Sequence, residues 1–328
     1  MSGPVLITGA AGFIGSHLAL RLAREGGRIR ALDVKPAPLA FHNTSIQYHR
    51  VDLRQVETVR AILDGVHTVF HLASAHLEVH ARAAFFEQVN VAAAASLAEE
   101  CAAAGVTRLV HTSSVGVYGH VLRPPAAEDA PVAPRNAYER TKLAGEKAVL
   151  EVAARRGLDV IVLRPAWVYG PGCGRTAKLV RSLQHRRFVF IGDGRNLRHP
   201  LYIDELVDAF GLAARASAEL SGRVYNIAGP RSLSVEELVT AFARAVGVAV
   251  PRRRIPRAAG WALGRGAELV WGIAGREPPF SRRSLSFFDA DNAFDTTAAF
   301  RDFGFVPRFE LEEGLRRTLN DATWRFAA

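Results

Sequence analysis

Cysteine is scarce in this chain of 328 residues, which holds two cysteines and one methionine. Cys101 and Cys173 are too few for a disulfide framework, which suits a reducing compartment, so we expect the cytoplasm. The chain also lacks long apolar runs, because the strongest candidate, residues 261–274, is short and carries Arg265 and Glu268. The N-terminal apolar run has no basic leader, so we expect neither a signal peptide nor a membrane partner.

Lysine is scarce too: only four of the 42 basic residues are lysines, at positions 35, 142, 147 and 178. The formal net charge is nevertheless +10, because arginines are spread along the whole chain. Their densest cluster, residues 252–257, has no interleaved aromatic side chains, which argues against nucleic-acid binding. The positive charge fits a small anionic substrate better.

The N-terminal stretch predicts a phosphate-binding turn. Residues 5–8 are apolar and partly β-branched, as in a strand buried on both faces, and three glycines follow at a three-residue spacing. Gly9 permits a tight turn, Gly12 lets the backbone approach a pyrophosphate, and Gly15 lets the next helix pack on the strand. The anion would lie at the helix N-terminus, where N–H groups and the helix dipole favour negative charge.

Asp33 makes a dinucleotide the expected ligand of this turn. Residues 18–24 are expected to be helical, residues 28–33 alternate as a second strand, and that strand ends on Asp33, eighteen residues after Gly15. A carboxylate at this separation accepts hydrogen bonds from both ribose hydroxyls of a dinucleotide and repels a 2′-phosphate. We therefore expect NAD rather than NADP, with Lys35 as the one reservation.

Strands and helices alternate over the first half of the chain. Further strands are expected at residues 45–51, 66–72, 108–112 and 159–164, and helices at residues 85–104 and 137–156. This alternation implies an α/β fold with a doubly wound parallel sheet and right-handed crossovers. We assign residues 1–172 to an NAD-binding domain, and residues 173–328 to a smaller, mostly helical substrate-binding domain that is partly interleaved with it.

Tyr138 and Lys142 carry the candidate chemistry. They lie four residues apart, on one face of a helix that Asn136 is expected to cap. A free tyrosine has a pKa of about 10, and a neighbouring ammonium lowers it by stabilising the phenolate. The phenol then exchanges a proton with a carbinol while hydride moves to or from a nicotinamide. Ser114 would hold the substrate oxygen, although such a serine often only caps a turn. For Tyr138 and Lys142 the alternative is that they merely lie on a solvated helix face.

These features resemble an extended short-chain dehydrogenase/reductase of the NAD-dependent epimerase/dehydratase family. The resemblance covers nearly the whole chain and rests on residues 8–15, 33, 52–53, 71–73, 113–114, 117–119, 138, 142, 163–165, 169–171, 192–194, 202–204 and 225–227. It implies a Rossmann fold, Tyr138 as acid/base, Ser114 as the residue that orients the carbinol, and Lys142 as a ligand of the nicotinamide ribose. It also implies a homodimer formed through the helices at residues 85–104 and 136–156.

The resemblance further implies a set of cofactor contacts, with Asp52 and Leu53 lining the adenine. The full set is Gly9, Gly12, Phe13, Ile14, Gly15, Asp33, Asp52, Leu53, Leu72, Ala73, Ser113, Tyr138, Lys142 and Pro165. Val115 and Gly116 depart from the family's sugar-nucleotide 4,6-dehydratases, which carry an Asp-Glu pair at these places to remove water. Neither residue can move a proton, and the glutamate of the related decarboxylases is missing too. The reactions that stay open are plain oxidation or reduction of a carbinol, and epimerisation by oxidation followed by reduction.

Two features favour different substrates. Arg198 falls where nucleotide-sugar enzymes of the family place a pyrophosphate-binding arginine, so we favour a nucleotide-sugar 4-epimerase. The apolar segment at residues 255–288, however, resembles the hydroxysteroid-dehydrogenase branch, which oxidises bulky apolar alcohols; an apolar stripe is also ordinary core. A non-catalytic NAD-sensing protein on the same fold is a further alternative, against which Tyr138 and Lys142 argue.

Three histidines and one cysteine stay outside the predicted chemistry. His71, His76 and His80 are close in sequence but make no convincing ligand set, so we predict no metal site. Cys173 lies in a Gly-Cys-Gly turn without a base beside it in sequence, and we expect a small turn residue there.

Overall fold

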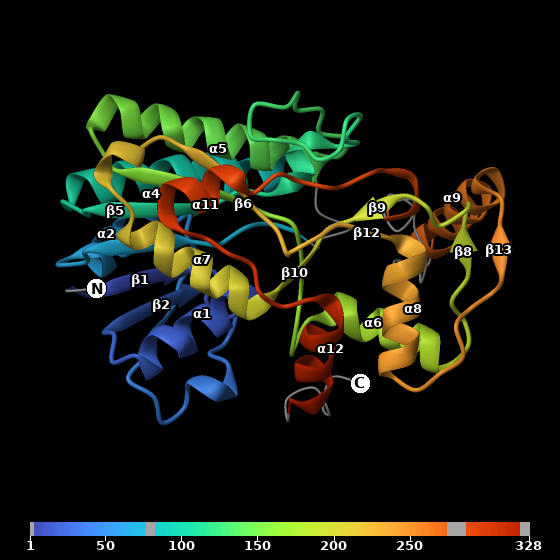
Figure 1. Cartoon of the computed structure of the whole chain (residues 1–328). Helices are drawn as coiled ribbons and strands as arrows, with labels where there is room; N and C mark the ends of the chain where they lie inside the picture. Colours follow the sequence, from blue (N-terminus) through green and yellow to red (C-terminus); the bar gives the residue numbers. More distant parts are fainter. Residues whose placement is uncertain (1–2, 77–82, 274–286, 322–328) are drawn as a thin grey trace.

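The computed structural model describes residues 3–76, 83–273 and 287–321. Its centre is a seven-stranded sheet in the order β11-β6-β5-β4-β1-β2-β3, in which every neighbouring pair is parallel (Figure 1). These strands are β1 (Val5–Thr8), β2 (Ile29–Asp33), β3 (Gln47–Arg50), β4 (Thr68–His71), β5 (Arg108–Thr112), β6 (Val160–Pro165) and β11 (Val224–Ile227). The predicted doubly wound parallel sheet is confirmed.

Helices cover both faces of the sheet, which is why its inner strands are apolar in runs rather than in alternation. α1 (Phe13–Arg24) and α7 (Ile203–Arg215) pack together on one face (Figure 1). α2 (Val56–Leu63), α4 (Ala93–Ala103) and α5 (Ala137–Arg156) pack on the other. All four residues of β1, and likewise of β4, are buried as this arrangement requires.

The strand order reverses at β1, which has β2 on one side and β4 on the other. Ligands of open α/β sheets bind beyond the carboxyl ends of the strands at such a switch point. The glycine turn after β1, Asp33 at the end of β2 and Leu72 after β4 all lie at this edge. The topology therefore brings together residues that the sequence presents far apart.

The rest of the chain adds helices and short strand pairs. The helices are α6 (Gly174–Gln184), α8 (Val235–Ala245), α9 (Arg257–Ile273), α11 (Thr297–Phe303) and α12 (Leu311–Asn320). The short strands are β7 (Trp167–Tyr169), β8 (Phe190–Ile191), β9 (Leu197–Arg198), β10 (Pro200–Tyr202), β12 (Leu233–Ser234) and β13 (Arg254–Ile255), paired as β7 with β10, β9 with β12, and β8 with β13. Among the described residues no helix is long and apolar enough to span a membrane. The domain boundary at residue 172 stays a prediction.

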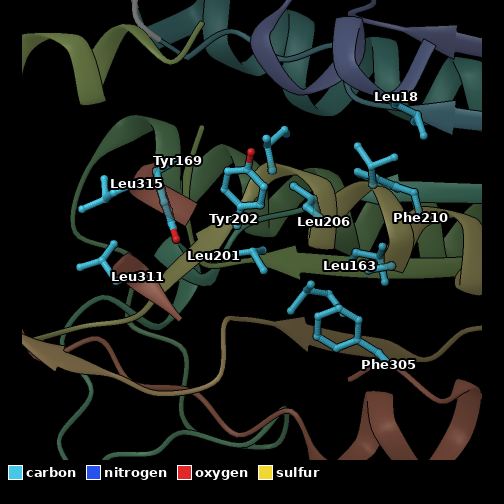
Figure 2. Packing of buried hydrophobic residues seen from close by; sticks show 14 of the residues in the cluster. Leu18, Leu163, Tyr169, Leu201, Tyr202, Leu206, Phe210, Phe305, Leu311 and Leu315 are labelled. Atoms are coloured by element: carbon cyan, nitrogen blue, oxygen red, sulfur yellow. The ribbon is translucent and has the colours of Figure 1, made fainter. Parts of the chain in front are cut away.

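One apolar core joins the sheet to these later helices. Figure 2 shows Leu18 of α1, Leu163 of β6 and Phe210 of α7 in the same cluster as Leu201 of β10 and Leu315 of α12. Each of these five side chains is at most 1% exposed. Burial of that apolar surface holds α12 against the sheet-bearing part of the molecule.

The helix expected at residues 85–104 is not continuous. α3 (Ala83–Glu87) leads into a π-helical turn (Gln88–Ala92) and only then into α4. α5 crosses this turn so closely that a Cβ on Gly145 would lie 2.0 Å from the Asn90 carbonyl oxygen. The wider turn also directs the Asn90 side chain inward, where it is 3% exposed.

Candidate active site

The glycine turn has the shape of a phosphate cradle. Gly9 has φ +71°, and a Cβ there would lie 2.6 Å from the Ala73 backbone nitrogen. A Cβ on Gly15 would lie 2.2 Å from the Gly9 carbonyl oxygen, so both positions require glycine. The N-cap of α1 is Gly12, which has no side chain to occupy the first helical N–H groups. Those groups can therefore bind an anion.

Asp33 is held against this cradle by backbone donors. Its Oδ2 accepts a hydrogen bond from the Ala11 nitrogen at 3.0 Å, and its Oδ1 accepts one from the Lys35 nitrogen at 3.0 Å. A carboxylate has about four lone-pair sites, so acceptor capacity remains for two hydroxyl groups. The orientation of Asp33 thus fits the ribose of a dinucleotide that lies on the glycine turn.

Asp52 and Leu53 lie after β3. Leu53 is buried, whereas the Asp52 carboxylate pairs with Arg54 at 2.6 Å. Hydrogen bonds from Arg54 lower the pKa of Asp52, so it is ionised at neutral pH. In this structure Asp52 is bound to an arginine, and its place at an adenine remains a prediction.

The loop after β4 is tied to β1 by a buried histidine. The Thr8 Oγ1 accepts a hydrogen bond from the Ala73 nitrogen at 3.2 Å and lies 2.7 Å from the His71 Nδ1. Burial, with a smaller contribution from Lys142, lowers the pKa of His71 to about 3, so its imidazole is neutral. Its ring lies beside that of His111, with centroids 5.1 Å apart and planes inclined by 37°.

His71 therefore has a structural role. Within the described ranges no group of three His, Cys, Asp or Glu side chains could hold a metal ion, and His80 lies outside them. Cys173 is free and buried as the N-cap residue of α6.

A helix cap at Asn136 positions Tyr138 and Lys142 on α5. The Asn136 side chain accepts a hydrogen bond from the Glu139 nitrogen at 3.0 Å, which confirms the predicted cap, and Tyr138 and Lys142 occupy successive turns. The Lys142 Nζ donates to the Thr112 carbonyl oxygen at 2.5 Å. Burial lowers the pKa of Lys142 to about 8, with Glu146 opposing the shift. A buried ammonium therefore lies one turn from the phenol at neutral pH.

Ser114 and Gly116 lie opposite the start of α5. Ser114 is the N-cap of a 3-10 turn (Val115–Tyr118), and its Oγ accepts a hydrogen bond from the Gly116 nitrogen at 3.1 Å. The hydroxyl hydrogen is not used in that bond and can still be donated. A Cβ on Gly116 would lie 3.1 Å from the Cγ of Glu139, whose carboxylate accepts a hydrogen bond from the Arg135 nitrogen at 2.6 Å. That carboxylate is therefore engaged at the helix start.

Arg198, the predicted diphosphate ligand, is 4% exposed. Its Nη1 donates to the carbonyl oxygens of Leu197 and Ala290, and its guanidinium lies 5.0 Å from the centroid of the Phe287 ring. Burial lowers its pKa to about 10, with Asp291 opposing, so it stays charged at neutral pH. Arg198 is thus a buried cation rather than an exposed one.

Sequence reasoning missed Asn90. Its Oδ1 accepts from the Ala75 nitrogen at 2.8 Å, and its Nδ2 donates to the Ala75 carbonyl oxygen at 3.1 Å and to the Thr141 Oγ1 at 3.0 Å. It therefore joins the loop after β4 to α5. Asn90 is a polar residue in an alanine-rich helical stretch, and that was the signal in the sequence.

The sequence also left His76 outside the site, whereas the structure places it there. Its ring centroid lies 4.4 Å from that of Tyr138, and its Nε2 accepts a hydrogen bond from the Arg175 Nη2. Arg175 is in the first turn of α6, and it too was absent from the predicted site residues.

Sheet order, glycine turn and the helix with Tyr138 and Lys142 together define a dinucleotide-binding α/β enzyme. The sequence profile of the NAD dependent epimerase/dehydratase family matches residues 5–228. The chain belongs to this family of extended short-chain dehydrogenases/reductases, whose members are enzymes with NAD as cofactor. The resemblance seen in the sequence is confirmed at this level.

Similar proteins catalyse several reactions. UDP-glucose 4-epimerase of Mycolicibacterium smegmatis is 32% identical and covers 96% of each chain. The Arabidopsis thaliana protein 3beta-hydroxysteroid-dehydrogenase/decarboxylase isoform 2 is 27% identical over 96% of this chain, which spans only 61% of that protein's length. Among solved structures, MoeE5 in complex with UDP-glucuronic acid and NAD is 30% identical with a TM-score of 0.79, covering 99% of this chain and 100% of its own. Family membership therefore leaves the substrate open.

Proposed function

We propose that the protein is an NAD-dependent nucleotide-sugar 4-epimerase, which acts by reversible hydride transfer at a secondary carbinol. The observation that carries this proposal is the buried Lys142 ammonium one turn from Tyr138, beside a strand end where Val115 and Gly116 stand in place of carboxylates. The first feature provides a proton acceptor, and the second removes the means of eliminating water. The similarity to an epimerase over 96% of both chains supports the same activity.

In this mechanism Tyr138 takes the proton from a ring hydroxyl of the sugar. The Lys142 ammonium would stabilise the phenolate before transfer and would also hold the nicotinamide ribose. Ser114 donates its hydroxyl hydrogen to the substrate oxygen. NAD, when bound, supplies the hydride acceptor and then the donor. The keto sugar would rotate between the two steps, so that hydride returns to the other face of the carbonyl carbon while Tyr138 returns the proton to the carbonyl oxygen.

The residues around the switch point fit NAD. Gly9 and Gly15, where a Cβ would collide with backbone, lie in the turn that would hold the pyrophosphate. The Asp33 carboxylate is hydrogen-bonded to Ala11 of the same turn. We propose contacts from Gly9, Gly12, Phe13, Ile14, Gly15, Asp33, Asp52, Leu53, Leu72, Ala73, Ser113, Tyr138, Lys142 and Pro165. A negatively charged Asp33 favours NAD over NADP because it repels a 2′-phosphate.

Arg198 is proposed to anchor the substrate diphosphate. While the sugar ring rotates, another part of the substrate must stay bound. A bidentate arginine contact to the diphosphate would hold it away from the reacting carbon. The buried position of Arg198 supports a strong contact, because a diphosphate that reached it would interact through little water.

Incubation with UDP- and dTDP-sugars tests this function. We expect a 4-epimerised sugar without net NADH, loss of turnover in Tyr138→Phe by about a hundredfold or more, and weaker sugar-nucleotide binding in Arg198→Ala. Accumulating NADH with an apolar alcohol, and no effect of Arg198→Ala, would show that the epimerase assignment is wrong. Undiminished turnover in Tyr138→Phe would contradict the mechanism.

Oxidation of a bulky apolar alcohol is the second candidate. Trp261 and Leu263 of α9 are exposed, by 37% and 61%, on the segment that resembles the hydroxysteroid branch. Side chains from residue 267 to 286 lie outside the described part of the chain. Sterol-like alcohols with excess NAD therefore belong in the same assay, and failure of both substrate classes would favour an NAD sensor.

A homodimer formed by the helices at residues 85–104 and 136–156 is also proposed. Family resemblance is its support. Light scattering tests the proposal, and a monomer at assay concentration would contradict it.

A further inference from the structure

His76 lies between the ring of Tyr138 and the guanidinium of Arg175. The two ring centroids are 4.4 Å apart, with planes inclined by 59°. On the other side the Arg175 Nη2 donates to the His76 Nε2. The three residues come from the first turn of α5, the loop after β4 and the first turn of α6, so only the folded chain brings them together.

The backbone next to His76 is fixed relative to α5. Asn90 accepts from the nitrogen of Ala75 and donates to its carbonyl oxygen, and it also donates to Thr141. The Thr141 Oγ1 donates in turn to the Tyr138 carbonyl oxygen at 3.1 Å. A chain of hydrogen bonds, most of them buried, thus connects the residue before His76 to the helical turn that carries the phenol.

The backbone that carries Arg175 is also fixed by hydrogen bonds. The turn before it closes through a hydrogen bond from the Cys173 nitrogen to the Gly170 carbonyl oxygen at 3.1 Å, and Ala177 continues the helix from Cys173. The His17 Nε2 of α1 donates to the Pro171 carbonyl oxygen at 2.9 Å. The start of α6 is therefore tied to the helix that follows the glycine turn.

Chemistry determines the state of the imidazole. An arginine only donates, so the His76 Nε2 must accept and the ring proton must lie on Nδ1. The His76 ring is then neutral, and it packs on the phenol while keeping the Arg175 charge close by. A packed ring restricts the phenol to one orientation and excludes water from its face.

We propose that His76, held in place by Arg175, is a positioning residue that keeps the Tyr138 phenol in the orientation and electrostatic surroundings needed for proton transfer. The inference rests on the proposed role of Tyr138. It extends that role to two residues that do not themselves exchange the proton. On α5, Glu139 follows Tyr138 directly and Lys142 lies one turn further on, while Arg175 of α6 is connected to the phenol through His76.

Titration of tyrosine gives a readout that needs no substrate. Burial raises the pKa of every other tyrosine in the chain. The pKa of Tyr48 is raised to about 12, and those of Tyr118, Tyr169, Tyr202 and Tyr225 are raised as well. Tyrosinate absorbance that develops below the ordinary tyrosine pKa of about 10 therefore reports Tyr138. Tyr138→Phe identifies the signal by removing it. The measurement is made on the NAD-loaded full-length protein.

Both His76→Ala and Arg175→Leu are expected to raise the midpoint of the Tyr138 absorbance titration by roughly half a pH unit. In the first variant the guanidinium moves into solvent, where water screens its charge; in the second the charge is gone. With UDP-glucose as probe, His76→Ala lowers kcat about tenfold and leaves KM within about twofold, because a misplaced phenol affects the chemical step. His76→Phe, which keeps a ring on the phenol, restores most of kcat.

A double-mutant cycle tests whether Arg175 acts through His76. If so, Arg175→Leu adds no further loss of kcat to His76→Ala. His185→Ala, at the exposed C-terminal end of the same helix, is the matched control and leaves midpoint and kcat unchanged. Unchanged Tyr138 midpoints in both single variants would overturn the inference, as would equal losses of kcat in His76→Ala and His76→Phe. If Tyr138→Phe kept full turnover, the proposed function would fail instead, whatever the midpoints.

Discussion

Arg164 of β6 and Glu146 of α5 form an ion pair of 2.5 Å in which the side chains are only 6% and 3% exposed. Arg164 also donates to the Tyr118 hydroxyl at 2.6 Å, and that hydroxyl donates to the Asn226 Oδ1 at 2.9 Å. The network therefore joins β6, α5, the turn after Ser114 and β11. It holds the helix that carries Lys142 against the strand ends.

Glu146→Gln should destabilise the protein by about 3 kcal/mol, because it leaves the Arg164 charge buried without its partner. Urea unfolding measures this loss. Glu313→Gln is the matched control, since Glu313 pairs with Arg316 and Arg317 at the surface and should contribute much less. Equal losses in the two variants would contradict the importance of burial.

Lys142→Met should abolish turnover yet stabilise the cofactor-free protein at pH 7 by roughly 1–3 kcal/mol. The folded pKa of Lys142 is lowered to about 8 from 10.5, so between these values the unfolded chain binds more protons than the folded one. Wild-type stability contributed by this group therefore rises as the pH increases from about 8 to about 10.5. Urea unfolding of both proteins at several pH values checks this. If the free energy of unfolding of the wild type does not rise relative to that of Lys142→Met over this pH range, burial of the Lys142 ammonium carries no cost.

Gly15→Ala should weaken NAD binding by about tenfold or more and lower the melting temperature, because its Cβ has no room beside the Gly9 carbonyl oxygen. Gly266→Ala is the control: it is also a helical glycine, but nothing lies near its added Cβ. There alanine should be neutral or stabilising by up to about 1 kcal/mol. Isothermal titration with NAD distinguishes the two, and tight NAD binding by Gly15→Ala would contradict the cradle.

NAD should bind at least about tenfold more tightly than NADP, and Asp33→Ala should lose most of that difference. The variant removes the repulsion of a 2′-phosphate together with the ribose contact and the bond to the Ala11 nitrogen. Parallel titrations of both proteins with both cofactors provide the measurement. Tighter NADP binding by the wild type would mean that the Lys35 side chain decides the preference.

Much of the site follows from local sequence. The order of residues alone places a glycine turn between β1 and α1, an acid at the end of β2, and Asn136 three residues before the nitrogen that it caps. Tyr138 and Lys142 share a helix face because a helix repeats every 3.6 residues, whatever surrounds it. These features depend on contacts within a few residues, which is why the sequence determines the fold class, the family and the candidate pair.

The tertiary structure decides the features that depend on distant contacts. β11 joins the main sheet, and two-residue strands such as β8 and β9 form, only because their partners lie beside them. Asn90 lies inward in a π-helical turn that α5 crosses at Gly145, and Arg198 is in contact with Phe287 and Ala290. His76 and Arg175 are 99 residues apart, so no periodicity could connect them. Packing of the whole chain brings His76 to Tyr138 and Arg175 to His76, because burial of apolar surface rather than local geometry selects which segments meet.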